Sequence, residues 1–132
     1  MDVTRRHTRA LQFVLRGAAE MATLEKRDKR YHIRFNICGN KLNRKRISLN
    51  FNPNVKDEEC AKERAIIFAE KIQNLIDFVY HKKDYKKPYI TISELYNYYN
   101  RDMITYDKFV ELKEVIEKSY YIELNKHFGR IC

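Results

Sequence analysis

The chain has 132 residues, which is enough for one ordinary domain or two very small ones. Its 44% hydrophobic and 34% charged residues are typical of a globular protein, its three Gly and two Pro argue against a long flexible linker, and no apolar run is long enough to cross a membrane. The net charge of +9 is unevenly distributed, because residues 21–56 alone carry a net charge of +8. Such clustering is the electrostatic pattern expected of a protein that binds a phosphate backbone.

Residues 1–20 differ in character from the rest of the chain. Their apolar stretch, ALQFVL, is short for the core of a signal peptide, and no convincing cleavage site follows it. Met21 opens MATLEKR, which reads like a natural start. We therefore expect residues 1–20 to be a fusion scar or an upstream extension rather than a native helix.

Residues 23–51 alternate between apolar and polar side chains with a period of two, which predicts β-strands. A short edge strand from Thr23 to Lys26 would end at a turn around residues 27–29, and RYHIRFNI and RKRISLNF would follow as a hairpin. The apolar side chains of the hairpin share one face: Tyr31, Ile33, Phe35, Ile37, Ile47, Leu49 and Phe51. Polar and basic side chains share the other: Arg30, His32, Arg34, Asn36, Arg44, Arg46, Ser48 and Asn50.

The two faces also predict a pairing register for the hairpin. A three-residue loop at Gly39-Asn40-Lys41 would pair Ile33 with Ile47 and Tyr31 with Leu49, whereas a two-residue loop would mix core residues with charges. The predicted register places Arg34 directly opposite Arg46, His32 beside Ser48 and Asn36 beside Arg44. Like charges in opposite positions destabilise a sheet by roughly 0.2–1 kcal/mol. Because neither strand carries an acid to relieve this repulsion, the polar face looks incomplete without an anionic partner.

A turn and a long helix follow the hairpin. Asp57 is a suitable N-cap, Glu58 and Glu59 suit the positive end of the helix dipole, and apolar residues recur at three- and four-residue spacing from Ala61 to Val79. We expect this apolar stripe to cover the apolar face of the sheet.

A basic connector over residues 81–90 reads equally well as a solvated linker or as an additional phosphate contact. Thr91 and Glu94 have capping-box spacing and predict a helix to about Arg101, and Thr105 predicts the N-cap of another helix that ends before Gly129. The apolar stripe of that last helix consists of Phe109, Leu112, Ile116, Tyr120, Leu124 and Phe128. We expect it to be left uncovered, as though the chain stopped inside a domain.

Together these elements predict an α+β fold, in which a small antiparallel three-stranded sheet packs on one long helix and a short all-α unit follows. The expected units are the extension 1–20, a sheet-plus-helix domain over residues 21–80, the basic linker 81–90, and a truncated helical domain over residues 91–132.

In this order the elements resemble the N-terminal part of a tyrosine recombinase of the phage-integrase family. The segment ATLEKRDKRYHIRFNICGNKLNRKRISLNF with its long helix resembles the arm-type DNA-binding domain, whose sheet lies in the major groove. The Thr91-x-x-Glu94-Leu95 opening, a second helix entered at a Thr and an ending in HFG resemble the start of the SAM-like core-binding domain. The resemblance covers about residues 22–131. It implies a role in DNA integration and recombination of a mobile element, in the bacterial cytoplasm, with duplex DNA and other integrase protomers as partners.

The resemblance does not extend to catalysis. In this family the reaction needs an Arg, a later His-x-x-Arg box and a Tyr nucleophile, all in a C-terminal domain. His127-x-x-Arg130 matches the box literally, but it lies in the core-binding region and the chain ends two residues later. We therefore interpret the match as chance, Tyr120 and Tyr121 as packing residues, and the chain as a fragment without strand-cleavage activity.

Ten residues are the candidates for DNA contact. Arg can bind guanine O6 and N7 in bidentate fashion and Asn can read adenine, whereas Lys at the margins is suited to phosphates. Base reading is assigned to the polar face: Arg30, His32, Arg34, Asn36, Arg44, Arg46 and Ser48. Phosphate contact is assigned to Lys29, Lys41 and Lys45.

Other functions are considered beside this one. The basic face could be merely solvated, the C-terminal helices could dock on a protein through Phe109, Leu112 and Ile116, and the sheet could bind RNA, although no aromatic pair on the polar face would stack bases. No catalytic constellation, cofactor, metal or small-molecule substrate is expected. Cys38, Cys60 and Cys132 match no metal or disulfide spacing, which favours a reducing cytoplasm.

Overall fold

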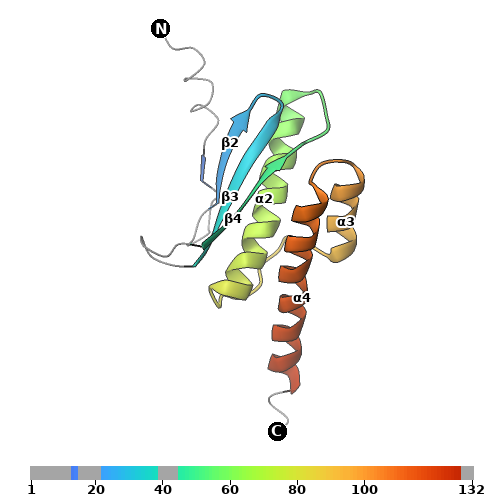
Figure 1. The fold of residues 1–132 in the computed structure, drawn as a ribbon. Coiled ribbons are helices and arrows are strands. Elements are labelled where there is room, and N and C mark those ends of the chain that lie inside the picture. Colours follow the sequence, from blue (N-terminus) through green and yellow to red (C-terminus); the bar gives the residue numbers. More distant parts are fainter. Residues whose placement is uncertain (1–12, 15–21, 39–44, 129–132) are drawn as a thin grey trace.

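The computed structural model of the protein describes residues 13–14, 22–38 and 45–128 (Figure 1). Its elements are β1 (Phe13–Val14), β2 (Thr23–Arg27), β3 (Arg30–Cys38), β4 (Lys45–Phe51), α2 (Glu58–Tyr80), α3 (Ile92–Asn100) and α4 (Tyr106–Phe128). They form three layers: the sheet, then α2, then α3 with α4 on the far side of α2. No helix in the described ranges is long and apolar enough to span a membrane.

The predicted α+β fold with a three-stranded antiparallel sheet on one long helix is confirmed. Strands β2, β3 and β4 pair antiparallel in sequence order, and the two-residue β1 adds a short pairing at the outer edge of β2. The edge strand runs one residue further than expected, because Arg27 still pairs with Arg30 across the two-residue turn Asp28-Lys29. Phe13 and Val14 belong to the segment interpreted as an extension, yet they pair with Leu24 and Thr23.

The predicted register of the hairpin is wrong by two residues. Ile33 lies opposite Leu49 rather than Ile47, and Tyr31 lies opposite Phe51. The expected pairing would have set Phe51 opposite Lys29 in the turn, whereas the observed one gives Phe51 a buried aromatic partner. A bulge between Asn36 and Cys38 accommodates one extra residue of β3. The last paired residues before the loop are Cys38 and Lys45, so the expected three-residue loop is also wrong. Gly39, Asn40 and Lys41 themselves lie outside the described residues.

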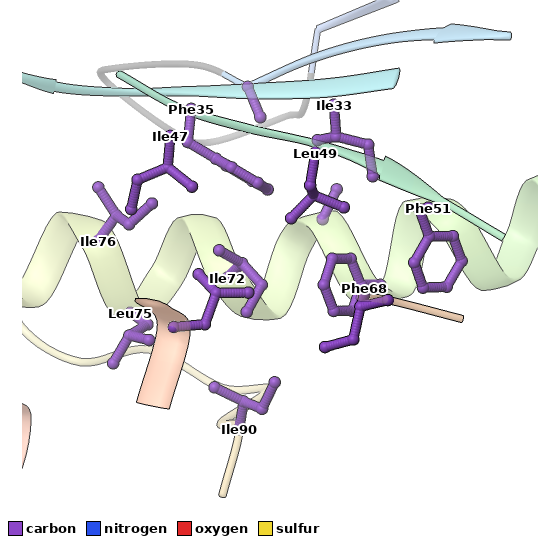
Figure 2. Close-up of a cluster of buried hydrophobic side chains, with 14 of the residues drawn as sticks. Ile33, Phe35, Ile47, Leu49, Phe51, Phe68, Ile72, Leu75, Ile76 and Ile90 are labelled. Atoms are coloured by element: carbon purple, nitrogen blue, oxygen red, sulfur yellow. The ribbon is translucent and has the colours of Figure 1, made fainter. Parts of the chain in front are cut away.

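The apolar faces of the sheet and α2 form the central core (Figure 2). Ile33, Phe35, Ile47, Leu49 and Phe51 point from the sheet towards α2 and are buried. From the helix, the partners in this layer include Phe68, Ile72 and Ile76, all fully buried. The expectation that the α2 stripe covers the apolar side of the sheet is thus confirmed.

Both predicted N-caps at the start of long helices are confirmed. The Asp57 side chain accepts a hydrogen bond from the Cys60 N–H at 2.9 Å, so it satisfies one of the otherwise unpaired donors of the first turn of α2. At the start of α4 the Thr105 hydroxyl accepts from the Lys108 N–H at 3.4 Å. Thr91 caps α3 in the same way, while Glu94 forms an ion pair with Lys71 of α2.

The expectation of an uncovered apolar stripe on α4 is wrong for the first part of the helix and holds for Tyr120 and Leu124, which are about half exposed. Leu112 and Ile116 are fully buried, and Phe109 is partly buried against the core, because α4 packs on both α2 and α3. The stripe becomes exposed only further along, where Tyr120 is 47% and Tyr121 69% exposed, so neither is the packing residue that we expected. Figure 1 shows the reason: the C-terminal half of α4 extends beyond α3. Gly129, the expected end signal, lies outside the described residues.

The helical segment shares one hydrophobic core with the sheet. Phe51 of β4 stacks on Phe68 of α2 with ring centroids 4.6 Å apart, and Tyr98 of α3 packs edge-on against Phe68 at 4.9 Å. Hydrogen bonds join the loop after β4 to the turn between α3 and α4, with Asn52 N–H donating to the Met103 carbonyl at 2.9 Å and Asn54 Nδ2 to the Arg101 carbonyl at 2.9 Å. These contacts fix α3 and α4 against the sheet-plus-helix unit.

Candidate nucleic-acid interface

The outer face of the sheet is the surface that strand alternation creates when every second residue is buried. All described helices lie on the opposite side of the sheet, so no helix covers this face (Figure 1). We call it the polar sheet face, defined by these residues: Thr23, Glu25, Arg27, Arg30, His32, Arg34, Asn36, Arg46, Ser48 and Asn50. Six of the predicted base-reading residues are therefore on one surface, as proposed from the alternation.

Cross-strand rows order the side chains of the polar sheet face. Arg34 lies between Thr23 of β2 and Ser48 of β4, and Asn36 lies opposite Arg46. The prediction that Arg34 lies directly opposite Arg46 is wrong, because the observed register makes them diagonal neighbours. Diagonal positions on one face are roughly 7–8 Å apart, so the two guanidinium groups repel each other less than in directly opposed positions and can point at successive features of a ligand.

A hydrogen-bonded pair lies in the next row. His32 Nδ1 is 3.0 Å from Asn50 Oδ1, so the ring N–H donates to the amide oxygen across the strands. His32 was expected beside Ser48 and instead orients Asn50. Asn50 was not among the predicted contact residues, although the same alternation places it on the polar face.

The face also carries one acid that the hairpin alone could not reveal. Glu25 of β2 lies opposite His32, and its carboxylate accepts a hydrogen bond from Arg27 Nε at 2.5 Å. Among the described residues the polar sheet face thus holds four arginines and a single carboxylate, which is already paired. The face as a whole stays positive, but the acid-free description applies only to β3 and β4.

The predicted phosphate contacts are only partly described. Lys29 is exposed in the turn between β2 and β3, beside Asp28, which has a positive φ of 58°. Lys41 and Arg44 lie outside the described residues, and Lys45 is placed only as the first residue of β4.

Tyr31, on the apolar face of the sheet that packs on α2, has a structural role. Burial raises the pKa of Tyr31, and the nearby Glu58 carboxylate raises it further. Tyr31 is therefore neutral at physiological pH and contributes packing instead of charge. In the described part of the chain, no group of three or more His, Cys, Asp and Glu side chains could hold a metal ion.

Comparison with known proteins gives no match: no protein-family model, no curated protein and no solved structure is significantly similar to the chain.

Proposed function

We propose that the protein binds duplex DNA in a sequence-specific manner by laying the polar sheet face in the major groove. The observation that carries the proposal is the gathering of Arg30, Arg34, Asn36 and Arg46 on one uncovered sheet face with a single, already paired carboxylate. A positively charged face of this kind supports binding to a phosphate-lined groove.

The dimensions of a β-ribbon suit this ligand. Neighbouring strands lie about 4.8 Å apart, and the major groove of B-DNA, about 12 Å wide, admits a two-stranded ribbon. Arg34 and Arg46 are the candidates for bidentate contact with guanine, and Asn36 for adenine. His32 and Asn50, already bonded to each other, would present one combined polar edge to the bases.

The biological context that we propose is the non-catalytic N-terminal region of a phage-type integrase, serving DNA integration and recombination. Its support is the order of elements: the sheet with its long helix comes first, and helices entered at Thr91 and Thr105 follow. An open reading frame that continues into an Arg, a His-x-x-Arg box and a Tyr would support this context, and a continuation into an unrelated domain would oppose it.

A salt-titrated duplex-binding assay tests the DNA-binding proposal. Duplexes selected from a random pool should bind with an affinity that falls steeply with salt, since each neutralised phosphate contributes about −0.9 to the log–log slope. The double variant Arg34→Ala/Arg46→Ala should lose preference for the selected duplex over a scrambled one. A matched control, Arg101→Ala/Lys113→Ala, removes two positive charges outside the sheet and should keep the preference. Equal preference in both variants would refute the assignment of the face.

The exposed end of α4 favours a second candidate, docking on another protein. Tyr121 is 69% and Leu124 50% exposed on the part of α4 that extends beyond α3. Sedimentation of the protein with and without the double change Tyr121→Ser/Leu124→Ser tests docking on a second copy of the chain: association that disappears in the variant would support docking through this end, and a monomer in both cases would oppose it.

A further inference from the structure

The C-terminal end of α2 is tied to the backbone of β3 by a chain of polar contacts. Gln73 Nε2 donates to Asp77 Oδ1 at 2.9 Å inside the core, and His81 Nε2 lies 3.9 Å from the same carboxylate oxygen. His81 Nε2 also donates to the backbone carbonyl of Asn36 at 3.2 Å. The contact with Asn36 holds His81 against the end of β3, where the bulge between Asn36 and Cys38 lies.

Two lysines follow at this point, and the backbone there is unusual. The Asp77 carbonyl accepts hydrogen bonds from both the His81 N–H at 3.0 Å and the Lys83 N–H at 3.1 Å, which turns the chain back over the end of the helix. Lys82, in the middle of this turn, has a left-handed φ of 57°. Glycine is the usual residue in that position after a helix, because a Cβ atom is disfavoured there.

The choice of residue at 82 is informative. The other non-glycine residues with positive φ in the described part of the chain are Asp28, Asn54 and Asp102, whose short polar side chains tolerate this conformation. Lysine has no such tolerance, so the backbone alone does not explain why it stands at position 82. A strained backbone position that keeps a charged side chain motivates a functional hypothesis for that charge.

Residues 82–84 carry two lysines and one exposed acid, Asp84, and so keep a net charge of +1. Asp77 is buried beneath them and already accepts from Gln73. Asp84 lines a separate cavity of 460 Å³ next to α4, together with Tyr85 and Lys126. Lys82 is exposed and Lys83 half-buried.

We propose that Lys82 and Lys83, which we call the α2 corner, contact the phosphates that flank the stretch of major groove occupied by the polar sheet face. This inference rests on the proposed DNA binding and adds a second, sequence-independent contact to it. The anchor from His81 to Asn36 fixes the distance between the two contacts, so the corner sets how deeply and in which orientation the sheet enters the groove. Phosphate contacts position a protein on DNA in this way, while base contacts specify the sequence.

The test compares salt dependence and sequence preference in a double variant of the α2 corner, Lys82→Gly/Lys83→Gln. Glycine at 82 suits the left-handed backbone, so the fold is expected to be retained, which circular dichroism and thermal unfolding check. The matched control Lys108→Ala/Lys113→Ala removes the same charge from α4, on the side of α2 away from the sheet. For the corner variant, we expect the log–log salt slope to become less steep by about 2 units, with unchanged preference for the selected duplex.

The outcomes separate the inference from the function on which it rests. A slope in the corner variant equal to that of the control would overturn the inference while leaving DNA binding by the sheet intact. A loss of sequence preference in the corner variant would also overturn it, since the corner would then read bases. A parent protein that binds no duplex at all would overturn the proposed function and this inference together.

Discussion

Replacing Leu112 by Ala tests whether the last helix belongs to the same folded body as the sheet. Leu112 lies on α4, which packs on α2 and α3, and its side chain is 0% exposed. Leu124, on the same helix, is 50% exposed. The change removes three carbon atoms from the core, worth about 2.4 kcal/mol at roughly 0.8 kcal/mol for each. The cavity left behind brings the expected loss in the free energy of unfolding to about 2–5 kcal/mol.

Urea unfolding followed by circular dichroism measures this loss. The same chemical change at Leu124 should cost less than about 0.5 kcal/mol, because its side chain is half in solvent in the folded state. The parent should unfold in one cooperative transition, since Phe51, Phe68 and Tyr98 join the three layers. Equal losses at the two leucines, or a separate early transition in which only the C-terminal helices melt, would refute the packing of α4 described above.

Three further predictions concern stability. Lys82→Gly should raise the free energy of unfolding by up to about 1 kcal/mol, because it removes the steric penalty of a left-handed lysine; a loss in urea unfolding would contradict this explanation of the turn. Asp57→Ala should lower it by about 1 kcal/mol, since the Cys60 N–H loses its acceptor; Asp57→Asn, which keeps an acceptor, should lose less, and an equal loss would argue against capping. Burial is the largest cause of the raised pKa values of Tyr31, Tyr85 and Tyr98, so the folded state holds their protons more tightly than the unfolded state. Their contribution to stability is present in full below the unfolded pKa of about 10 and is lost as pH rises from there through the folded values; stability that stays constant in this range would show that the three rings ionise freely.

The elements of the fold follow from local sequence patterns. Alternation of side chains identified β2 to β4, and the spacing of apolar residues with Asp57, Thr91 and Thr105 located the three helices. These signals are local, because each depends on residues within one or two turns or along one strand.

The hairpin register could not be obtained from the same signals. A slip of one residue reverses the faces of a strand, but a slip of two preserves them, so alternation alone cannot distinguish Ile33–Ile47 from Ile33–Leu49 pairing. The observed register depends on Phe51, which reaches both Tyr31 and Phe68, and on the bulge after Asn36. Those are contacts between segments far apart in the chain.

The sequence predicts the candidate site only as far as alternation along a strand tells on which face of the sheet a side chain lies. Arg30, Arg34 and Arg46 follow from alternation in β3 and β4, but Glu25 enters the same surface only through pairing of β2 with β3. The α2 corner depends on the contact of His81 with the Asn36 backbone, 45 residues away, which no periodicity in the sequence encodes.

Exchange of Arg34 and Arg46 for lysine tests the central claim most directly. The variant Arg34→Lys/Arg46→Lys keeps the charge of the polar sheet face but replaces the planar two-donor fork that fits guanine O6 and N7 with a single ammonium. If the face reads bases, competition between the selected and scrambled duplexes at fixed salt should show a fall in preference, of about 30-fold if each of the two contacts loses about 1 kcal/mol of discrimination. The salt slope should remain that of the parent. An unchanged preference in the lysine variant would contradict the account of this face as a reader of DNA sequence.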